Sequence, residues 1–259
     1  MRPPSPDESP AAGSSLPEPV PTPPVMRSVE EVVSEALPML DEANRPAGLE
    51  AHLQTYLRKL LETNQHVNLV SRRDTLSHVA RFTRECLFLA RLLLEDVGRL
   101  QRQRPLRLLD LGSGGGFPGV ILKLALPDVE VQLVEGTRKK ARFLAEVCGQ
   151  LDLRKMGVLW GRAEELADPR FPIHKPEFRH HFDWVTGKGL GKLQASLELA
   201  APFLAVEGAH WTFKGKSIQE ELQAASGLFR QRGFARLRVE PIPGEEESFV
   251  VGIRRLPPK

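Results

Sequence analysis

The sequence predicts an α/β fold in which a mostly parallel β-sheet is covered by helices on both faces. Between about residues 108 and 232, short apolar or alternating runs are each followed by a helical pattern, which favours parallel strands joined by helical crossovers. A glycine-rich run at 112–119 directly follows the first of these strands. Two final strands, at 235–242 and 249–254, are joined by a link so short that they must pair antiparallel.

Composition is typical of a cytoplasmic globular protein. The 259 residues give room for one large domain, or for one domain with extensions, and a hydrophobic content of 41% is ample for a core. The net charge of +3 permits a nucleic-acid partner without requiring one. No apolar run approaches the length of a membrane span, and the N-terminus lacks the apolar core of a signal peptide. We therefore expect a cytoplasmic protein with no membrane partner.

The two cysteines point to a reducing compartment. Cys86 and Cys148 each lie in an apolar helical pattern, which indicates buried free thiols rather than a disulfide. The chain shows no spacing of metal-ligand residues, so we expect no metal.

Three regions are predicted along the chain. Residues 1–25 hold nine of the 22 prolines and too little apolar surface to offset the entropy of ordering, which predicts a disordered tail. Residues 26–100 are expected to form a helical extension packed on the sheet, with helices at 28–45, 47–65 and 74–100 that carry apolar residues at helical spacing. Residues 101–259 are expected to form the cofactor-binding domain.

The centre of that domain is a strand–loop–helix–strand unit. The strand 108–111 runs into the glycines, a helix follows from Val120, and the alternating run 129–134 predicts the next strand. Glu135 closes that strand about 20 residues after the glycines, the distance at which a carboxylate reaches the ribose of a bound nucleotide. The alternative is that Glu135 is a solvated acid at a strand end.

The remaining elements complete the alternation. Thr137 is expected to cap the next helix, which carries four cations near its start. We expect the rest of the chain to contain a strand at 156–160, a polar loop at 161–166, a strand at 182–186, a helix at 194–204, a strand at 209–214, a helix at 217–232, and the terminal hairpin.

The glycine spacing admits two ligands. The pattern Gly114-x-Gly116-x-x-Gly119 matches the dinucleotide fingerprint of an NAD-type oxidoreductase, but it leaves Asp110 without a role and shows no second substrate domain. The pattern Asp110-x-Gly112-x-Gly114-x-Gly116 resembles the first motif of S-adenosylmethionine-dependent methyltransferases. We favour the second interpretation.

A more specific resemblance covers roughly residues 49–254. The runs LLDLGSGGGFPGVILKLALPDVEVQLVEGTRKKARFLAEV, GRAEEL, FDWVTGKGLGKL and FKGKSIQEEL, with NLVSRRD upstream, resemble the RsmG (GidB) family of bacterial small-subunit ribosomal RNA guanine-N7 methyltransferases. The resemblance implies a Rossmann-like class I methyltransferase fold with a seven-stranded sheet. It also implies an enzyme, expected to be monomeric, that uses S-adenosyl-L-methionine on ribosomal RNA in the small ribosomal subunit.

The resemblance also assigns site residues. It places the cofactor against Gly112, Gly114, Phe117, Glu135, Ala163, Glu164 and Lys188. Two of these have plainer alternatives, since Phe117 could serve the core alone and Glu164 could cap a short helix. The basic residues expected to meet RNA phosphate are Arg138, Lys139, Lys140 and Lys214.

Three segments depart from the family pattern. The Arg-His-x-x-Asp-Ser element appears here as 81–86, RFTREC, the Ser-Arg-Ala element as 187–189, GKG, and the Arg-His pair near the C-terminus as 247–249, ESF. These changes keep two alternatives open. One is a divergent paralogue that methylates another RNA or a small molecule, and the other is a cofactor-binding module without turnover.

No acid or base catalyst is assigned. Guanine N7 carries a lone pair at neutral pH, so it needs no general base, and catalysis can rest on alignment of the reacting atoms. The methylated purine is cationic, which argues against Lys188 as a direct partner of the base and favours a contact with the cofactor carboxylate or an RNA phosphate.

Overall fold

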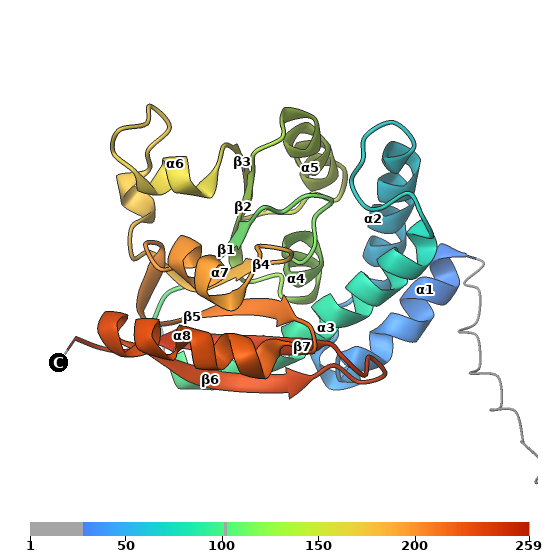
Figure 1. Cartoon of the computed structure of the whole chain (residues 1–259). Helices are drawn as coiled ribbons and strands as arrows, with labels where there is room; N and C mark the ends of the chain where they lie inside the picture. The colour runs from blue at the N-terminus through green and yellow to red at the C-terminus, as the bar shows by residue number, and fades with distance from the viewer. Residues whose placement is uncertain (1–27, 101–102, 259) are drawn as a thin grey trace, which may run out of the picture.

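The computed structural model describes residues 28–100 and 103–258, and within them one seven-stranded sheet forms the centre of the molecule (Figure 1). The strand order is β3-β2-β1-β4-β5-β7-β6. The first five strands are parallel, whereas β7 runs antiparallel to both β5 and β6. The strands are β1 (Arg107–Leu111), β2 (Glu130–Glu135), β3 (Met156–Trp160), β4 (Phe182–Gly187), β5 (Leu204–Lys214), β6 (Phe234–Pro241) and β7 (Phe249–Arg255). The predicted parallel sheet with an antiparallel C-terminal hairpin is confirmed.

The side chains of alternate strand residues pack into two separate hydrophobic cores, one on each face of the sheet, because successive side chains of a strand point to opposite faces. Leu108 of β1 and Leu133 of β2 pack with the N-terminal helices, whereas Leu109 and Val134 pack on the other face. The first face is covered by α1 (Val29–Ala36), α2 (Leu49–Asn64), α3 (Thr75–Leu100), α4 (Gly119–Ala125) and α5 (Arg138–Gln150), and the second by α6 (Ala163–Ala167), α7 (Leu193–Ala200) and α8 (Ile218–Arg232). Helices therefore cover both faces of the sheet, and its central strands β1 and β4 are almost entirely buried.

The N-terminal helices share one core with the sheet. Leu53 and Leu57 of α2 and Leu87 and Leu93 of α3 are fully buried in the same cluster as Trp184 of β4. Figure 1 shows α1, α2 and α3 side by side against one flank of the sheet. This arrangement agrees with the predicted helical layer. The Pro-rich segment predicted to be disordered lies outside the described residues.

Several boundaries differ from the sequence prediction. The helix expected at 28–45 begins with a capping box between Ser28 and Glu31 but ends at Ala36, where two short 3₁₀ turns, η1 (Leu37–Met39) and η2 (Glu42–Asn44), follow. Pro38 lacks the backbone N–H that a continuing helix would use. The expected polar loop at 161–166 contains a short helix, α6. Strand β5 already begins at Leu204, because α7 ends at Ala200.

Within the described residues no helix is both long and apolar enough to cross a membrane. The same part of the chain contains no group of three or more His, Cys, Asp or Glu side chains that could hold a metal ion. Cys86 and Cys148 are free thiols, the first fully buried and the second half-buried, so the prediction of two buried thiols is correct in full only for Cys86.

Candidate cofactor and substrate site

The glycine loop between β1 and α4 has a backbone that other residues adopt only with strain. Gly112, Gly114 and Gly116 have φ angles of 68°, 57° and 103°. A Cβ on Gly116 would lie 2.7 Å from both the Tyr56 hydroxyl and a methyl of Val120. The Tyr56 hydroxyl donates to the carbonyl of Gly115 at 2.6 Å, so α2 holds this loop from behind. The repeated glycines are therefore required by the local geometry.

Asp110 anchors the loop from the end of β1. Its buried carboxylate accepts hydrogen bonds from the Gly119 N–H at 3.1 Å and from the Thr186 hydroxyl at 3.1 Å. Burial raises the pKa of this carboxyl from 3.8 to about 6, although these hydrogen bonds oppose the shift. Asp110 thus ties the start of α4 to the neighbouring strand β4, a role that the dinucleotide interpretation did not supply.

Glu135 at the end of β2 reaches across to the same loop. One carboxylate oxygen accepts from the Gly114 N–H at 2.8 Å, and the other accepts from the Thr137 N–H at 2.6 Å. The Thr137 side chain makes no capping hydrogen bond, so the prediction that Thr137 caps α5 is wrong. The residue is only 7% exposed. A freely solvated strand-end acid would not show this burial or these two contacts.

A cavity of about 340 Å³ opens beside the glycine loop. Its walls come from that loop, from α3, from the segment after β4, and from the end of β5. Phe117 lines it with only 5% of its surface exposed, because its ring packs 5.9 Å from Tyr56 and 5.4 Å from Phe82, centroid to centroid. Phe117 therefore serves the core and the cavity wall at once.

Lys188 and Glu85 form an ion pair in the wall of this cavity. The Glu85 carboxylate is 3% exposed; it accepts a hydrogen bond from the Lys188 ammonium and lies 3.8 Å from the Arg81 guanidinium. The same ammonium lies 4.3 Å from the ring centroid of Phe82 and 4.6 Å from that of Phe213. The cation is thus held between a carboxylate and two aromatic faces.

Phe82 and Glu85 were singled out in the sequence only as part of a departure from the family pattern, whereas Lys188 was also predicted to contact the cofactor. Phe82 and Glu85 belong to the altered 81–86 segment, and Lys188 belongs to the altered 187–189 segment. The structure brings both segments into one cavity, although they lie 103 residues apart. Nothing in the sequence indicated that Phe213 lines a cavity, apart from its position near the end of a predicted strand. The fold places it opposite Phe82, and sequence spacing could not have shown that.

The predicted adenine-side residues lie at the start of α6. Ala163 is buried and Glu164 is exposed, and both line a second hollow that also includes Leu190. A Cβ on Gly112 would lie 3.3 Å from a methyl of Leu190, so this hollow adjoins the glycine loop. Glu165, rather than Glu164, accepts from the backbone N–H that precedes the helix, at 3.4 Å. The capping alternative for Glu164 is therefore wrong.

The predicted RNA-binding residues separate into two groups. Arg138 and Lys139 are exposed at the start of α5, and Lys140 is half-buried. Lys214 is different, because its ammonium donates to the Gly191 carbonyl at 2.5 Å and pairs with Glu221 at 3.4 Å, with only 4% of the side chain exposed. Burial lowers the pKa of Lys214. This placement speaks against the predicted phosphate contact for Lys214.

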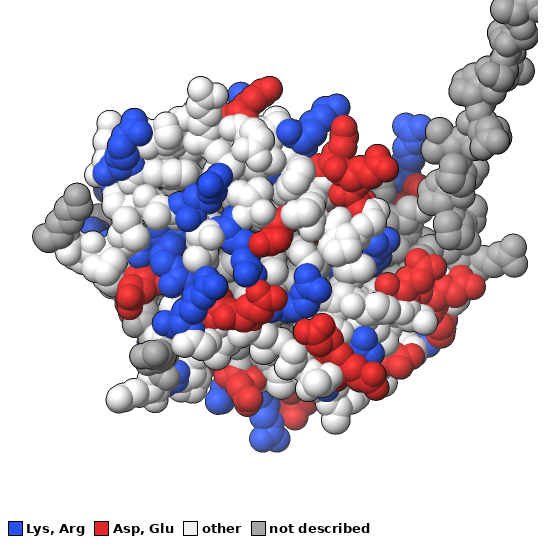
Figure 2. Space-filling view, turned by 90° about the horizontal axis from the view of Figure 1, so that it is seen from below, with Lys and Arg blue, Asp and Glu red and all other residues white. Residues whose placement is uncertain are grey.

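Charges on another face of the molecule are mixed. Figure 2 shows Lys and Arg side chains interspersed with Asp and Glu on the face seen from below. On β6, for example, Arg238 pairs with Glu95 of α3 and with Glu240 at 3.3 Å. These two glutamates offset the charge of Arg238.

The comparisons with known proteins identify the family of this chain. A family profile described as "rRNA small subunit methyltransferase G" matches residues 49–250. A protein of that name from Chloroflexus aggregans is 33% identical over 80% of this chain and 82% of its own length. Another, from Sorangium cellulosum, is 38% identical over 72% of this chain and 73% of its own length. A crystal structure of an S-adenosylmethionine-dependent methyltransferase from Aquifex aeolicus aligns over 62% of this chain and 89% of that chain, with 16% identity and a TM-score of 0.45. On the family match and these identities, the chain belongs to the rRNA small subunit methyltransferase G family.

Proposed function

We propose that this protein transfers a methyl group from S-adenosyl-L-methionine to N7 of a guanine in small-subunit ribosomal RNA. Family membership supports the reaction class and the ribosomal substrate. One structural observation carries the proposal furthest, namely the position of the glycine loop. It lies at the carboxyl end of β1, where the strand order turns from β2 on one side to β4 on the other. Open α/β sheets bind nucleotide-like ligands at this switch point.

The residues around the loop fit the parts of this cofactor. Gly112 is exposed, and its missing Cβ leaves room toward Leu190 that a side chain would fill. The Glu135 carboxylate can accept from both ribose hydroxyls, as it now accepts from two backbone N–H groups. Ala163 and Glu164 border the adjoining hollow for the adenine, and Lys188 offers a cation for the carboxylate.

The cavity beyond the loop fits a purine base. S-adenosylmethionine, when bound, supplies an electrophilic methyl group on a sulfonium sulfur. Phe82 and Phe213 line this cavity with apolar surface, and a good alignment of the reacting atoms can account for about 7–11 kcal/mol of the barrier. Because N7 has a free lone pair, no side chain has to remove a proton.

The electrostatics of the cavity suit a base that becomes cationic. Aromatic faces stabilise a positive charge, and Glu85 offsets the charge of Lys188. In this arrangement Lys188 is not a lone cation facing the methylated base, so the family position that has changed to lysine remains compatible with the reaction.

The RNA would be attracted chiefly by the start of α5. Arg138 and Lys139 are exposed cations at the same edge of the sheet as the cavity, and Lys140 is close by in the sequence. Contacts of this kind give binding that weakens as salt rises. The proposal includes a monomeric protein that acts in the cytoplasm, where its ribosomal substrate is assembled.

The altered segments motivate a second candidate, a cofactor-binding module without turnover. The ion pair of Lys188 with Glu85 occupies the cavity wall where the substrate base would lie. Such a module would bind the cofactor but transfer no methyl group to any RNA.

Labelled methyl transfer to unmodified small ribosomal subunits tests the proposal. The expected result is stoichiometric labelling at one guanine, with the label mapped to N7 by the sensitivity of 7-methylguanine to reduction and strand cleavage. Calorimetric binding of S-adenosylhomocysteine without any transfer would overturn the ribosomal substrate and favour the second candidate. Absence of binding would overturn the cofactor site itself.

A further inference from the structure

Trp160, the last residue of β3, is a large aromatic side chain that the fold leaves exposed. It is 56% exposed, whereas the other two tryptophans of the chain, Trp184 and Trp211, are 0% and 1% exposed. Within residues 28–100 and 103–258, no other exposed large hydrophobic side chain exceeds 42%. An exposed Trp forfeits much of the free energy that burial of its ring would give, and it leaves an apolar ring surface accessible to a ligand.

The ring is held in place. Its indole N–H donates to the Gly136 carbonyl at 3.1 Å, and the Arg138 guanidinium lies 5.5 Å from its ring centroid. Gly136 lies in the turn that leads from β2 into α5, and Arg138 is the first residue of α5. Trp160 therefore presents a preorganised apolar surface, and the entropy cost of fixing its side chain falls on folding rather than on binding.

The place of Trp160 connects it with the candidate site. In the sheet register, Trp160 is the partner of Glu135, and the Glu135 carboxylate reaches Gly114 of the cavity wall. Trp160 thus lies one strand outward from the strand that carries Glu135, at the same edge of the sheet as the glycine loop.

The charges around Trp160 suit a polyanion. Arg138, Lys139 and Arg162 are all exposed, and Glu164 and Glu165 follow Arg162 in the first turn of α6. Glu165 already accepts from the Arg162 backbone N–H, and Glu135 is buried against the loop. An aromatic surface next to arginines is the combination that binds unpaired nucleotides, with the base on the ring and the phosphate on the cation.

We propose that Trp160 and Arg138 form a stacking site for an unpaired base of the RNA substrate, separate from the base that is methylated. This inference rests on the proposed function, since it concerns the RNA that the enzyme would modify. The occupant is a single-stranded nucleotide near the target, because a base can stack on Trp160 only when it is free of its own helix.

Fluorescence isolates this side chain. Trp184 and Trp211 are buried, so collisional quenching and RNA-dependent changes in tryptophan emission report chiefly on Trp160. Titration of the wild type with a single-stranded oligonucleotide copied from the small-subunit RNA should quench the emission, and rising salt should reverse the effect. Emission that is unchanged at saturating oligonucleotide would overturn the proposal, whether or not the enzyme transfers methyl groups.

Kinetics with two variants and a control complete the test. Trp160→Ala should raise KM for unmodified subunits about tenfold, leave kcat nearly unchanged, and leave the affinity for S-adenosylhomocysteine unchanged. Trp160→Phe should retain most of the affinity for subunits, because a smaller ring still stacks. Phe171→Ala, at a 41% exposed aromatic in the segment between α6 and β4, should match the wild type.

The outcomes separate this proposal from the proposed function. A wild type that transfers methyl groups while Trp160→Ala keeps its KM would overturn the stacking site alone. A parallel loss of S-adenosylhomocysteine affinity in Trp160→Ala would also overturn it, because Trp160 would then cover the cofactor. Quenching by RNA without any methyl transfer would overturn the proposed function and leave the stacking site supported.

Discussion

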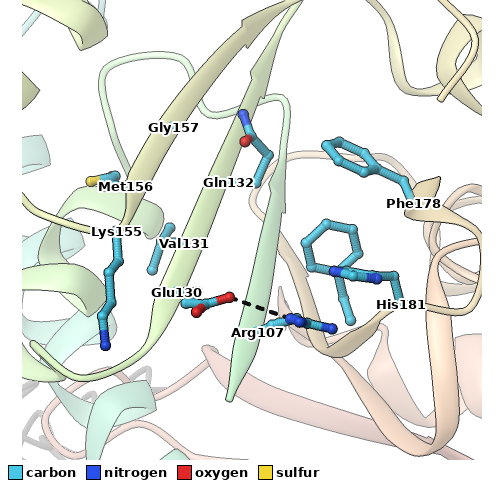
Figure 3. A pocket seen from close by; sticks show the side chains of 10 residues that line it. Arg107, Glu130, Val131, Gln132, Lys155, Met156, Gly157, Phe178 and His181 are labelled. Carbon is cyan, nitrogen blue, oxygen red and sulfur yellow. Dashed lines mark hydrogen bonds and ion pairs between the residues drawn. The ribbon is translucent and has the colours of Figure 1, made fainter. Parts of the chain in front are cut away.

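The two edges of the sheet carry cavities of similar size but different construction. At the carboxyl edge, a cavity of about 340 Å³ is lined by the glycine loop, with the Glu135 carboxylate in contact with that loop. At the amino edge, a cavity of about 410 Å³ lies over the first residues of β1, β2 and β3 (Figure 3). Volume alone therefore does not identify the functional site.

The amino edge satisfies its charges internally. Arg107 pairs with Glu130 at 3.3 Å, as Figure 3 shows. The buried Asp183 carboxylate accepts from the Arg104 guanidinium at 2.8 and 3.1 Å and from the Arg107 N–H at 3.0 Å. Burial lowers the pKa of His181 there, which favours its neutral form. The arginines and carboxylates of this edge therefore pair with one another, while Gln132, Lys155 and His181 also line the cavity.

The carboxyl edge instead relies on backbone geometry. Three glycines with positive φ bring the chain close to Glu135 and to the cavity, and Asp110 holds the loop from below. A ligand can replace the hydrogen bonds of Glu135 without breaking an ion pair of the fold. The two edges therefore differ in the polar groups that a ligand can contact, and these groups indicate a binding site better than the cavity volume does.

A matched pair of glycines should show the largest difference between the edges. Gly116→Ala should destabilise the fold by about 3 kcal/mol, because it combines a φ of 103° with a Cβ 2.7 Å from two atoms. Gly157→Ala, at the amino edge, should cost less than about 1 kcal/mol, because the nearest atom, at 2.5 Å, is the mobile end of Gln132. Urea denaturation of both variants measures this, and equal costs would contradict the comparison.

A pH effect should come from Asp110. The pKa of Asp110 is raised to about 6 in the folded protein, so the protonated carboxyl stabilises the fold. This contribution to the free energy of unfolding is fully present below pH 4, and about 3 kcal/mol of it is lost as the pH rises through 6. Asp110→Asn should remove this pH dependence of stability, because an amide does not titrate. The amide oxygen can still accept from the Gly119 N–H. Denaturation midpoints between pH 4 and 7 check this, and a variant with the wild-type slope would assign the effect to another group.

Two acids of one strand should differ in cofactor binding. Glu135→Ala should weaken the binding of S-adenosylhomocysteine by about 1.5–3 kcal/mol, because it removes the charge-assisted hydrogen bonds that we propose to the ribose. Glu130→Ala, at the other end of β2, should leave the dissociation constant unchanged. Calorimetry on both variants gives the answer, and a Glu135 variant that binds like the wild type would remove this carboxylate from the site.

The smallest effect is expected at the Arg107–Glu130 pair. Its two side chains are 30% and 40% exposed, so solvent screens the attraction. Arg107→Ala should cost less than about 1 kcal/mol of stability and should leave methyl transfer at the wild-type rate. A large loss of activity in this variant would show that the amino-edge cavity takes part in function.

The strand–loop–helix unit and its acid could be predicted because their signals are local. The glycines, Asp110 and Glu135 lie within 26 residues of one another in the sequence, and periodicity places them on one edge of a parallel sheet. The segment of α6 was expected to be a polar loop, with a short helix only as an alternative, because only five residues carry the helical pattern.

The contacts of the lysines could not be predicted, because they depend on distant packing. Lys188 meets Glu85 across 103 residues, and both positions depart from the family pattern. Lys214 turns inward because Glu221, from the first turn of α8, lies within 3.4 Å. A charge in a sequence gives no information about which partner the fold will bring to it.

Hydrogen–deuterium exchange with and without S-adenosylhomocysteine tests the central claim most directly, because it compares both edges of the sheet in one sample. The account predicts that the cofactor product protects peptides covering residues 110–118, 134–140 and 186–191, while those covering 103–107, 154–157 and 176–183 remain unchanged. Protection confined to the second group, or to neither, would contradict the assignment of the carboxyl edge as the cofactor site.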